Sequence, residues 1–161
     1  TTQPVDDVKP AALQYSYGGS PLRLTQITDG VTSARWSKLH YWGDAGFTCP
    51  TTAGYNSAPT TGLLCQVETS DGQVTNFYYT AANQLGRITE PGGEMVDYGY
   101  DSLSRIASVR SALANDAIVA GLRTQNTDEI TSLTYDTLGR VTSLTAPAAT
   151  AGATPARATT A

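Results

Sequence analysis

The sequence predicts an all-β protein built from consecutive antiparallel hairpins, with one short helix. Short runs of alternating Val, Ile, Leu, Tyr and Thr recur along the chain, and alternation with a period of two residues is typical of strands. Turn-forming pairs such as Asp71-Gly72 separate these runs, because both positions of an Asp-Gly turn tolerate positive φ. The composition agrees, since 15 glycines supply many turns and only 15% of the residues are charged.

The predicted strands follow one another at short intervals, which indicates a meander of hairpins. They cover residues 13–17, 22–28, 31–36, 63–69, 73–79, 87–90, 94–100, 105–110, 130–135 and 140–145. Residues 18–21 form the first turn, and Asp29-Gly30 is expected to lead directly into the strand at 31–36.

Two stretches interrupt this pattern. Residues 47–61 are rich in Thr, Gly and Pro and are expected to form a long loop. Residues 111–129 form an insert that begins at Ser111, a good helix cap. Its helix formers end near Gly121, so we expect a short helix near 112–121.

The two ends of the chain lack a hydrophobic period. Residues 1–12 are expected to be an extended segment. Residues 147–161 form an Ala-, Thr- and Pro-rich tail that we expect to be extended on a partner or loosely ordered. The hairpins therefore occupy residues 13–146.

A short motif recurs at the turns. Tyr-Asp-Ser-Leu-Ser-Arg-Ile at 100–106 matches Tyr-Asp-Thr-Leu-Gly-Arg-Val at 135–141. Asn-Gln-Leu-Gly-Arg-Ile at 83–88 keeps the second half, and residues 15–24 form a degenerate copy. The residues expected to carry the repeat are Tyr17, Tyr79, Tyr100, Tyr135, Asp101, Asp136, Leu103, Leu138, Gly139, Arg87, Arg105 and Arg140.

Each position of the motif has a physical use. The Tyr supplies a flat surface for cross-strand packing, and the Asp accepts hydrogen bonds from backbone N–H groups at the turn. The Gly tolerates positive φ, and the Leu beside it is expected to pack inward. The Arg follows the Asp by four residues, so we expect it to pair with that Asp or to stack on a Tyr of the next unit.

This Tyr-Asp-x-x-Gly-Arg signature resembles the YD repeat of the Rhs family, which includes bacterial Rhs proteins, the C components of insecticidal toxin complexes and teneurins. The flanking segments 62–67 and 113–118 look like those of large secreted Rhs proteins of high-GC Gram-positive bacteria. The resemblance implies one arc of a spiral β-sheet shell, with further repeats of the parent chain or neighbouring copies as partners. It also implies a structural, non-enzymatic role around an enclosed part such as a toxin domain, in a secreted or cell-surface bacterial protein.

This sequence departs from a complete family member in two respects. It holds too few repeats to close a shell, and it lacks the Asp-Pro-rich autoproteolytic region that ends the shell in toxin-bearing members. We therefore expect the chain to lie against further repeats.

Several other functions are disfavoured. The net charge is −4 and no Lys or Arg cluster marks a nucleic-acid footprint. No run approaches the roughly 18 apolar residues of a membrane span. The first residues lack the charged and apolar regions of a signal peptide, so we expect the export signal to lie outside this chain.

Two cysteines, Cys49 and Cys65, bracket the predicted loop. A disulfide between them would stabilise the fold by about 3 kcal/mol, and two buried thiols are the alternative. Two cysteines without a supporting His do not make a structural zinc site. We expect neither a metal nor a cofactor.

Catalytic constellations are weak. Glu90 and Glu94 flank a turn, and a carboxylate pair about 5 to 9 Å apart is the arrangement of a glycosidase, although turn residues are the simpler interpretation. His40 with Ser37 and Asp44 has the letters of a hydrolase triad but no nucleophile-elbow motif. We expect no catalytic residues.

The densest aromatic patch contains Trp36, Tyr41 and Trp42. Such rings either fill the packed face of the sheet or stack on sugars. A cell-surface adhesion or carbohydrate-binding module, with a surface glycan as partner, is therefore the alternative function.

Overall fold

The computed structural model describes residues 12–30, 34–123, 130–147 and 157–159, and it confirms the all-β prediction. The chain forms two compact units. The first comprises residues 1–49 and 61–74, and the second comprises residues 50–60 and 75–161.

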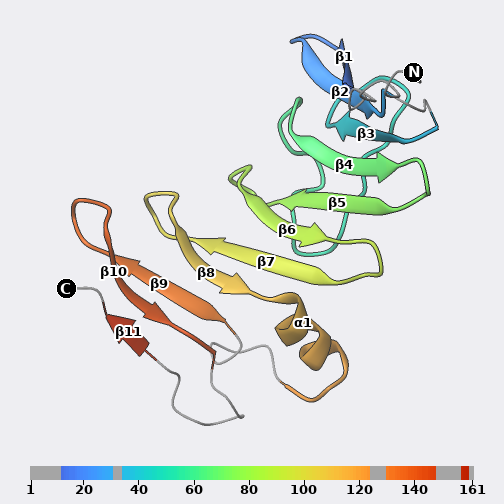
Figure 1. Ribbon diagram of the computed structural model, residues 1–161. Coiled ribbons are helices and arrows are strands. Elements are labelled where there is room, and N and C mark those ends of the chain that lie inside the picture. Colours follow the sequence, from blue (N-terminus) through green and yellow to red (C-terminus); the bar gives the residue numbers. More distant parts are fainter. Residues whose placement is uncertain (1–11, 31–33, 124–129, 148–156, 160–161) are drawn as a thin grey trace, which may run out of the picture. The chain divides into compact units, whose positions relative to one another are not determined.

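The first unit is a meander of antiparallel strands in chain order (Figure 1). Its strands are β1 (Gln14–Gly18), β2 (Arg23–Thr28), β3 (Trp36–Tyr41) and β4 (Leu64–Thr69). The Asp71-Gly72 turn follows β4, where Gly72 adopts φ 80° and donates its N–H to the Thr69 carbonyl at 2.9 Å.

The second unit continues the same pattern of antiparallel neighbours (Figure 1). Its strands are β5 (Val74–Tyr79, from Thr75 onward), β6 (Leu85–Thr89), β7 (Met95–Tyr100), β8 (Ile106–Arg110), β9 (Thr131–Tyr135), β10 (Val141–Thr145) and β11 (Arg157–Thr159). One helix, α1 (Ala112–Val119), lies between β8 and β9 in the chain.

The helix begins and ends where its sequence signals predicted. The Ser111 hydroxyl accepts the N–H of Ala114 at 3.3 Å, which satisfies one of the free donors of the first turn. Gly121 adopts φ 71° after the last turn. The side chain of Asn115 donates to the Met95 carbonyl at 2.7 Å and fixes α1 against β7.

One predicted strand is wrong, and one observed strand was not predicted. β3 begins at Trp36, where the predicted strand 31–36 was expected to end, and residues 31–33 lie outside the described part of the chain. The N–H of Asp29 donates to the carbonyl of Arg35 at 2.9 Å, so the connection is wider than a two-residue Asp-Gly turn.

The strand that was not predicted is β11, in the Ala-, Thr- and Pro-rich tail. β11 pairs with β10 through Ser143 and Thr159, although its residues show no strand pattern. Backbone groups of an edge strand accept a partner whatever its side chains are, and this explains why composition did not predict β11. The segment 1–11, expected to be extended, lies outside the described residues.

The expected loop contains neither helix nor strand between β3 and β4. Residues 50–60 of this loop belong to the second unit and are hydrogen-bonded within it. The N–H of Asn56 donates to the Tyr79 carbonyl at 2.8 Å, and the N–H of Thr60 donates to Oδ1 of Asn83 at 3.0 Å.

Few side chains are fully buried. Among the described residues the buried apolar side chains are Cys49, Cys65, Tyr79 and Ala114. Most strand residues are half-buried, so strand pairing and cross-strand contacts stabilise this fold more than a closed core does. In the described part of the chain, no helix has the length and apolar character needed to cross a bilayer.

Candidate functional site

The geometry that the two Tyr-Asp turns share is the main feature of the second unit. The N–H of Asp101 donates to the carbonyl of Arg105 at 2.9 Å, and the N–H of Ser104 donates back to the carbonyl of Asp101 at 3.0 Å. The same two bonds at the next turn join Asp136 with Arg140 at 2.9 Å and Gly139 with Asp136 at 3.1 Å.

The Asp carboxylate holds each turn closed. Oδ1 of Asp101 accepts the backbone N–H groups of Leu103 and Arg105, both at 2.9 Å, and Oδ2 accepts Nε of Arg105 at 2.7 Å. Asp136 makes the matching three bonds at the same distances. The backbone N–H of Arg105 is the main cause that lowers the pKa of Asp101. These carboxylates are therefore held in the ionised form by the turn itself.

The third turn corrects the predicted register of the repeat. The N–H of Thr80 donates to the Gln84 carbonyl at 2.8 Å, and the N–H of Asn83 donates to the Thr80 carbonyl at 2.9 Å. In this turn Gln84 therefore occupies the position that Arg105 has in the motif, whereas the sequence pattern had assigned that position to Arg87. Arg87 instead lies within β6.

Positive φ is the property that the turns share. Gly139 adopts φ 83°, while Ser104 adopts 63° and Asn83 adopts 59°. Asn is among the residues that reach this region most readily, and Ser replaces the expected glycine at a steric cost.

The motif leucines do not pack inward. Leu103 is 69% exposed and Leu138 is 77% exposed, so this expectation is wrong. Both lie at the tip of a turn, where the chain has left the sheet and has no neighbouring strand to cover it.

Consecutive hairpins are joined by a Tyr–Arg contact, which we call the interlock. The guanidinium carbon of Arg105 lies 4.4 Å from the ring centre of Tyr135. Nη1 of Arg105 also donates to the Asp136 carbonyl at 3.3 Å. The Tyr135 hydroxyl donates to the carbonyl of Ile106 at 2.6 Å. The hairpin of β9 and β10 thus covers the arginine of the hairpin before it.

The hydroxyl bond of the interlock recurs without an arginine at Tyr100, and the full contact recurs in the first unit. The Tyr100 hydroxyl donates to the carbonyl of Leu85 at 2.8 Å. Leu85 directly follows Gln84, just as Ile106 directly follows Arg105. In the first unit, Arg23 lies 4.5 Å over the ring of Tyr41, whose hydroxyl donates to the Leu24 carbonyl at 2.6 Å. The interlock is therefore a repeated device within both units.

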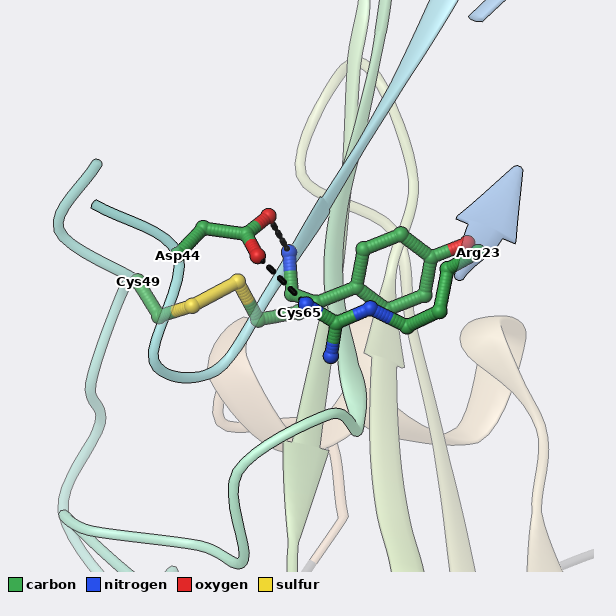
Figure 2. The surroundings of a disulfide bond; sticks show 5 residues. Arg23, Asp44, Cys49 and Cys65 are labelled. Carbon is green, nitrogen blue, oxygen red and sulfur yellow. Dashed lines mark hydrogen bonds and ion pairs between the residues drawn. A yellow bond between two sulfur atoms is a disulfide. The ribbon is translucent and has the colours of Figure 1, made fainter. Parts of the chain in front are cut away.

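In the first unit the interlock lies beside a disulfide. Cys49 and Cys65 are bonded, with their Cα atoms 5.7 Å apart. Figure 2 shows the ion pair between Arg23 and Asp44 in these surroundings, with Nη2 and Oδ1 separated by 2.7 Å. Oδ2 of Asp44 accepts the N–H of Tyr41 at 2.9 Å. Asp44 therefore supplies the carboxylate that the turn between β1 and β2 lacks.

The remaining predicted residues have separate surroundings. Trp36 lies beside Lys38, whose ammonium is 4.3 Å from the ring centre, whereas Tyr41 is engaged by Arg23. The indole N–H of Trp42 is buried without a hydrogen-bond partner. Tyr17, in the degenerate copy, is 61% exposed on β1.

The two glutamates considered for catalysis lie at the β6–β7 turn. The N–H of Glu90 donates to the Glu94 carbonyl at 2.8 Å, and the N–H of Gly93 donates to the Glu90 carbonyl at 3.0 Å. Their backbones therefore form the same kind of turn as the repeat motif.

Sequence reasoning missed a polar cluster around Asp97. Its carboxylate lies between Arg87 and Arg110, which are its cross-strand partners on β6 and β8. Tyr55, from the loop, donates its hydroxyl to Oδ1 of Asp97 at 3.0 Å. Opposite charges at paired strand positions were the only available signal.

No protein-family model matches this chain, and no curated protein matches it. Among solved structures, the chain is similar to part of the Photorhabdus luminescens Tc holotoxin pore. The match has 18% sequence identity and a TM-score of 0.40, and it covers 77% of this chain. The chain spans 6% of the length of that toxin chain.

Proposed function

We propose that this chain is a non-enzymatic structural segment of an Rhs/YD-repeat shell. In this role it scaffolds or encloses another part, such as a toxin domain, of a secreted or cell-surface protein. The Tyr-Asp motif and the interlock support the proposal, because the motif closes the turn of each hairpin and the interlock joins one hairpin to the next. A device that links consecutive hairpins suits a sheet extended by repetition.

The exposed Arg140 is the observation that carries the proposal. Arg140 makes the same bonds to Asp136 that Arg105 makes to Asp101, at equal distances. The Arg105 side chain is only 29% exposed because Tyr135 covers it, whereas that of Arg140 is 75% exposed. No ring stacks on Arg140 in the part of the chain that the structure describes. The Arg140 guanidinium is thus held in position for stacking by the tyrosine ring of a further hairpin.

The chemistry of the turns also favours a structural role. The carboxylates of Asp101 and Asp136 each accept two backbone N–H groups and one guanidinium N–H. Carboxylates occupied in this way stabilise a turn and hold their own arginine in position.

The test is the size of the native protein. An antibody raised against this chain, used on a denaturing gel of the source cells and their medium, should detect a band far larger than 16.9 kDa. Light scattering of the purified native protein should give a matching mass. A stable native monomer of 16.9 kDa would contradict the shell proposal.

A second candidate function, glycan binding, rests on Trp36. This residue lines a cavity of about 430 Å³ in the first unit. Polar groups share the cavity, among them those of Asp29, Arg35, Ser70 and Asp71. An aromatic ring beside several hydrogen-bonding groups suits a sugar.

Retention on immobilised glycans tests this candidate. Binding should be lost in Trp36→Ala and kept in Trp42→Ala, since Trp42 does not line the cavity. Equal retention by both variants would exclude the Trp36 cavity as the glycan site.

A further inference from the structure

Three charged side chains form a row across the second unit. Arg87 on β6, Asp97 on β7 and Arg110 on β8 are successive cross-strand partners. Arg87 binds Asp97 with two hydrogen bonds, from Nε to Oδ1 at 2.5 Å and from Nη2 to Oδ2 at 2.9 Å. Nη1 of Arg110 lies 3.5 Å from Oδ2 of Asp97, which is beyond a good charged hydrogen bond.

The carboxylate is already satisfied without Arg110. Tyr55 donates its hydroxyl to Oδ1 of Asp97 at 3.0 Å, and Arg87 occupies both oxygens. Burial by itself would raise the pKa of Asp97, but the hydrogen bonds and charge of Arg87, with smaller contributions from Tyr55 and Arg110, together outweigh burial and hold the pKa below its usual value. Asp97 is therefore an ionised and well-neutralised partner of Arg87.

Arg110 is left with surplus positive charge. Two guanidinium groups share one carboxylate, so the row carries a net charge of +1. Nε of Arg110 is buried and has no hydrogen-bond partner. A buried donor on a cation is costly when it is unpaired, and an anion would relieve that cost.

A cavity of about 240 Å³ adjoins Arg110. Its lining includes Asp97, Gly99, Ser108 and Ile130. Gly99 makes room for the Ser108 hydroxyl, because a Cβ atom at position 99 would collide with Oγ of Ser108, its cross-strand partner. The cavity thus brings together the under-neutralised guanidinium of Arg110, the Ser108 hydroxyl, two tyrosines, the Asp97 carboxylate and the apolar side chain of Ile130.

We propose that this cavity binds a small organic carboxylate, whose carboxylate pairs with Arg110 and whose remaining polar group bonds Ser108. The planar guanidinium matches a carboxylate and donates to it in a fixed geometry. The volume is below that of drug-sized sites, which limits the ligand to about the size of one sugar ring. Asp97 opposes the ligand weakly, because Arg87 neutralises its charge and Tyr55 donates a hydrogen bond to it.

Titration calorimetry on the full chain tests the proposal, with acetate, lactate and glucuronate as probes and glucose as the neutral match for glucuronate. At least one carboxylate should bind saturably, and glucose should not bind. Arg110→Gln should weaken that binding about tenfold or more, which is the effect of losing one charge-assisted hydrogen bond. Arg140→Gln removes an exposed arginine outside the cavity and should leave the affinity unchanged.

Ser108→Val provides an independent variant that keeps the charge row and suits a strand. It places methyl groups in the cavity and should also weaken binding severalfold. Circular dichroism checks that each variant is folded. The proposal is overturned if none of the three carboxylates binds, if glucose competes equally with glucuronate, or if folded Ser108→Val binds like the unaltered chain.

Discussion

Removing a single hydroxyl tests whether the interlock stabilises the sheet. Tyr135→Phe keeps the ring over Arg105 and deletes the 2.6 Å bond from the tyrosine to the carbonyl of Ile106. A net intramolecular hydrogen bond contributes about 1 kcal/mol, and Ile106 is partly exposed, so water can replace part of the bond. We expect the free energy of unfolding to fall by about 0.5 to 1 kcal/mol.

Tyr135→Ala removes the ring as well. The contact of the guanidinium with an aromatic face adds about 0.5 to 1 kcal/mol at a partly exposed site, and ring packing adds more. We therefore expect a loss of about 2 kcal/mol. In a double-mutant cycle with Arg105→Gln, Tyr135→Ala should show a coupling of about 0.5 to 1 kcal/mol.

Urea unfolding at 25 °C, followed by circular dichroism, measures these changes. Tyr17→Phe is the matched control, because the Tyr17 side chain is largely exposed, and its effect should stay within about 0.5 kcal/mol. Equal midpoints for Tyr135→Phe and Tyr17→Phe, or a coupling of zero between Tyr135 and Arg105, would refute the interlock as a stabilising device.

Three further predictions concern the disulfide and the turns. Reduction of Cys49–Cys65, which closes a separation of 16 residues, should lower stability by about 3 kcal/mol, seen as a lower thermal midpoint with reductant than without it. The folded pKa of Asp101 is depressed, so the stability that its carboxylate contributes to the fold is present above its unfolded pKa of about 3.9 and is lost as the pH falls toward the folded pKa. Asp101→Asn should therefore lower the free energy of unfolding at pH 7 and change it little at pH 2. A difference between the two proteins that stays constant with pH would contradict this. Gly139→Ala, at φ 83°, should cost about 1 kcal/mol in urea unfolding, whereas Ser104→Gly, at φ 63°, should be neutral or stabilising; the opposite order would contradict the role of positive φ.

Local patterns predicted most of the fold. Alternating residues located nine of the described strands to within two residues, because successive side chains of a strand point to alternate faces of the sheet. β3 was misplaced because the Asp29-Gly30 pair has the form of a tight turn, while the backbone makes a wider connection that closes at Arg35. β11 depends on the backbone of β10 and not on its own side chains.

The repeat was found by its letters, but its register depends on the backbone. Leu-Gly-Arg at 85–87 imitates the end of the motif, and this displaced the predicted arginine position from Gln84 to Arg87. A better guide was the spacing of four residues from the tyrosine to the residue with positive φ, which is Tyr79 to Asn83 in this turn. Opposite charges on neighbouring strands were the only signal of the cluster at Asp97, and the part of Tyr55 could not be predicted, because Tyr55 reaches Asp97 from a loop more than 40 residues away in the chain.

The interlock makes the assembly of the sheet directional along the chain. Each tyrosine reaches back to the strand that precedes it, so a hairpin gains its final contacts only when its successor is in place. Synthesis from the N-terminus supplies successors in that order, and each new hairpin would lock the one before it while the next is still emerging. A force applied at the C-terminal side would break these contacts in the reverse order and release the hairpins one at a time. The unfolding force would then show a series of small steps.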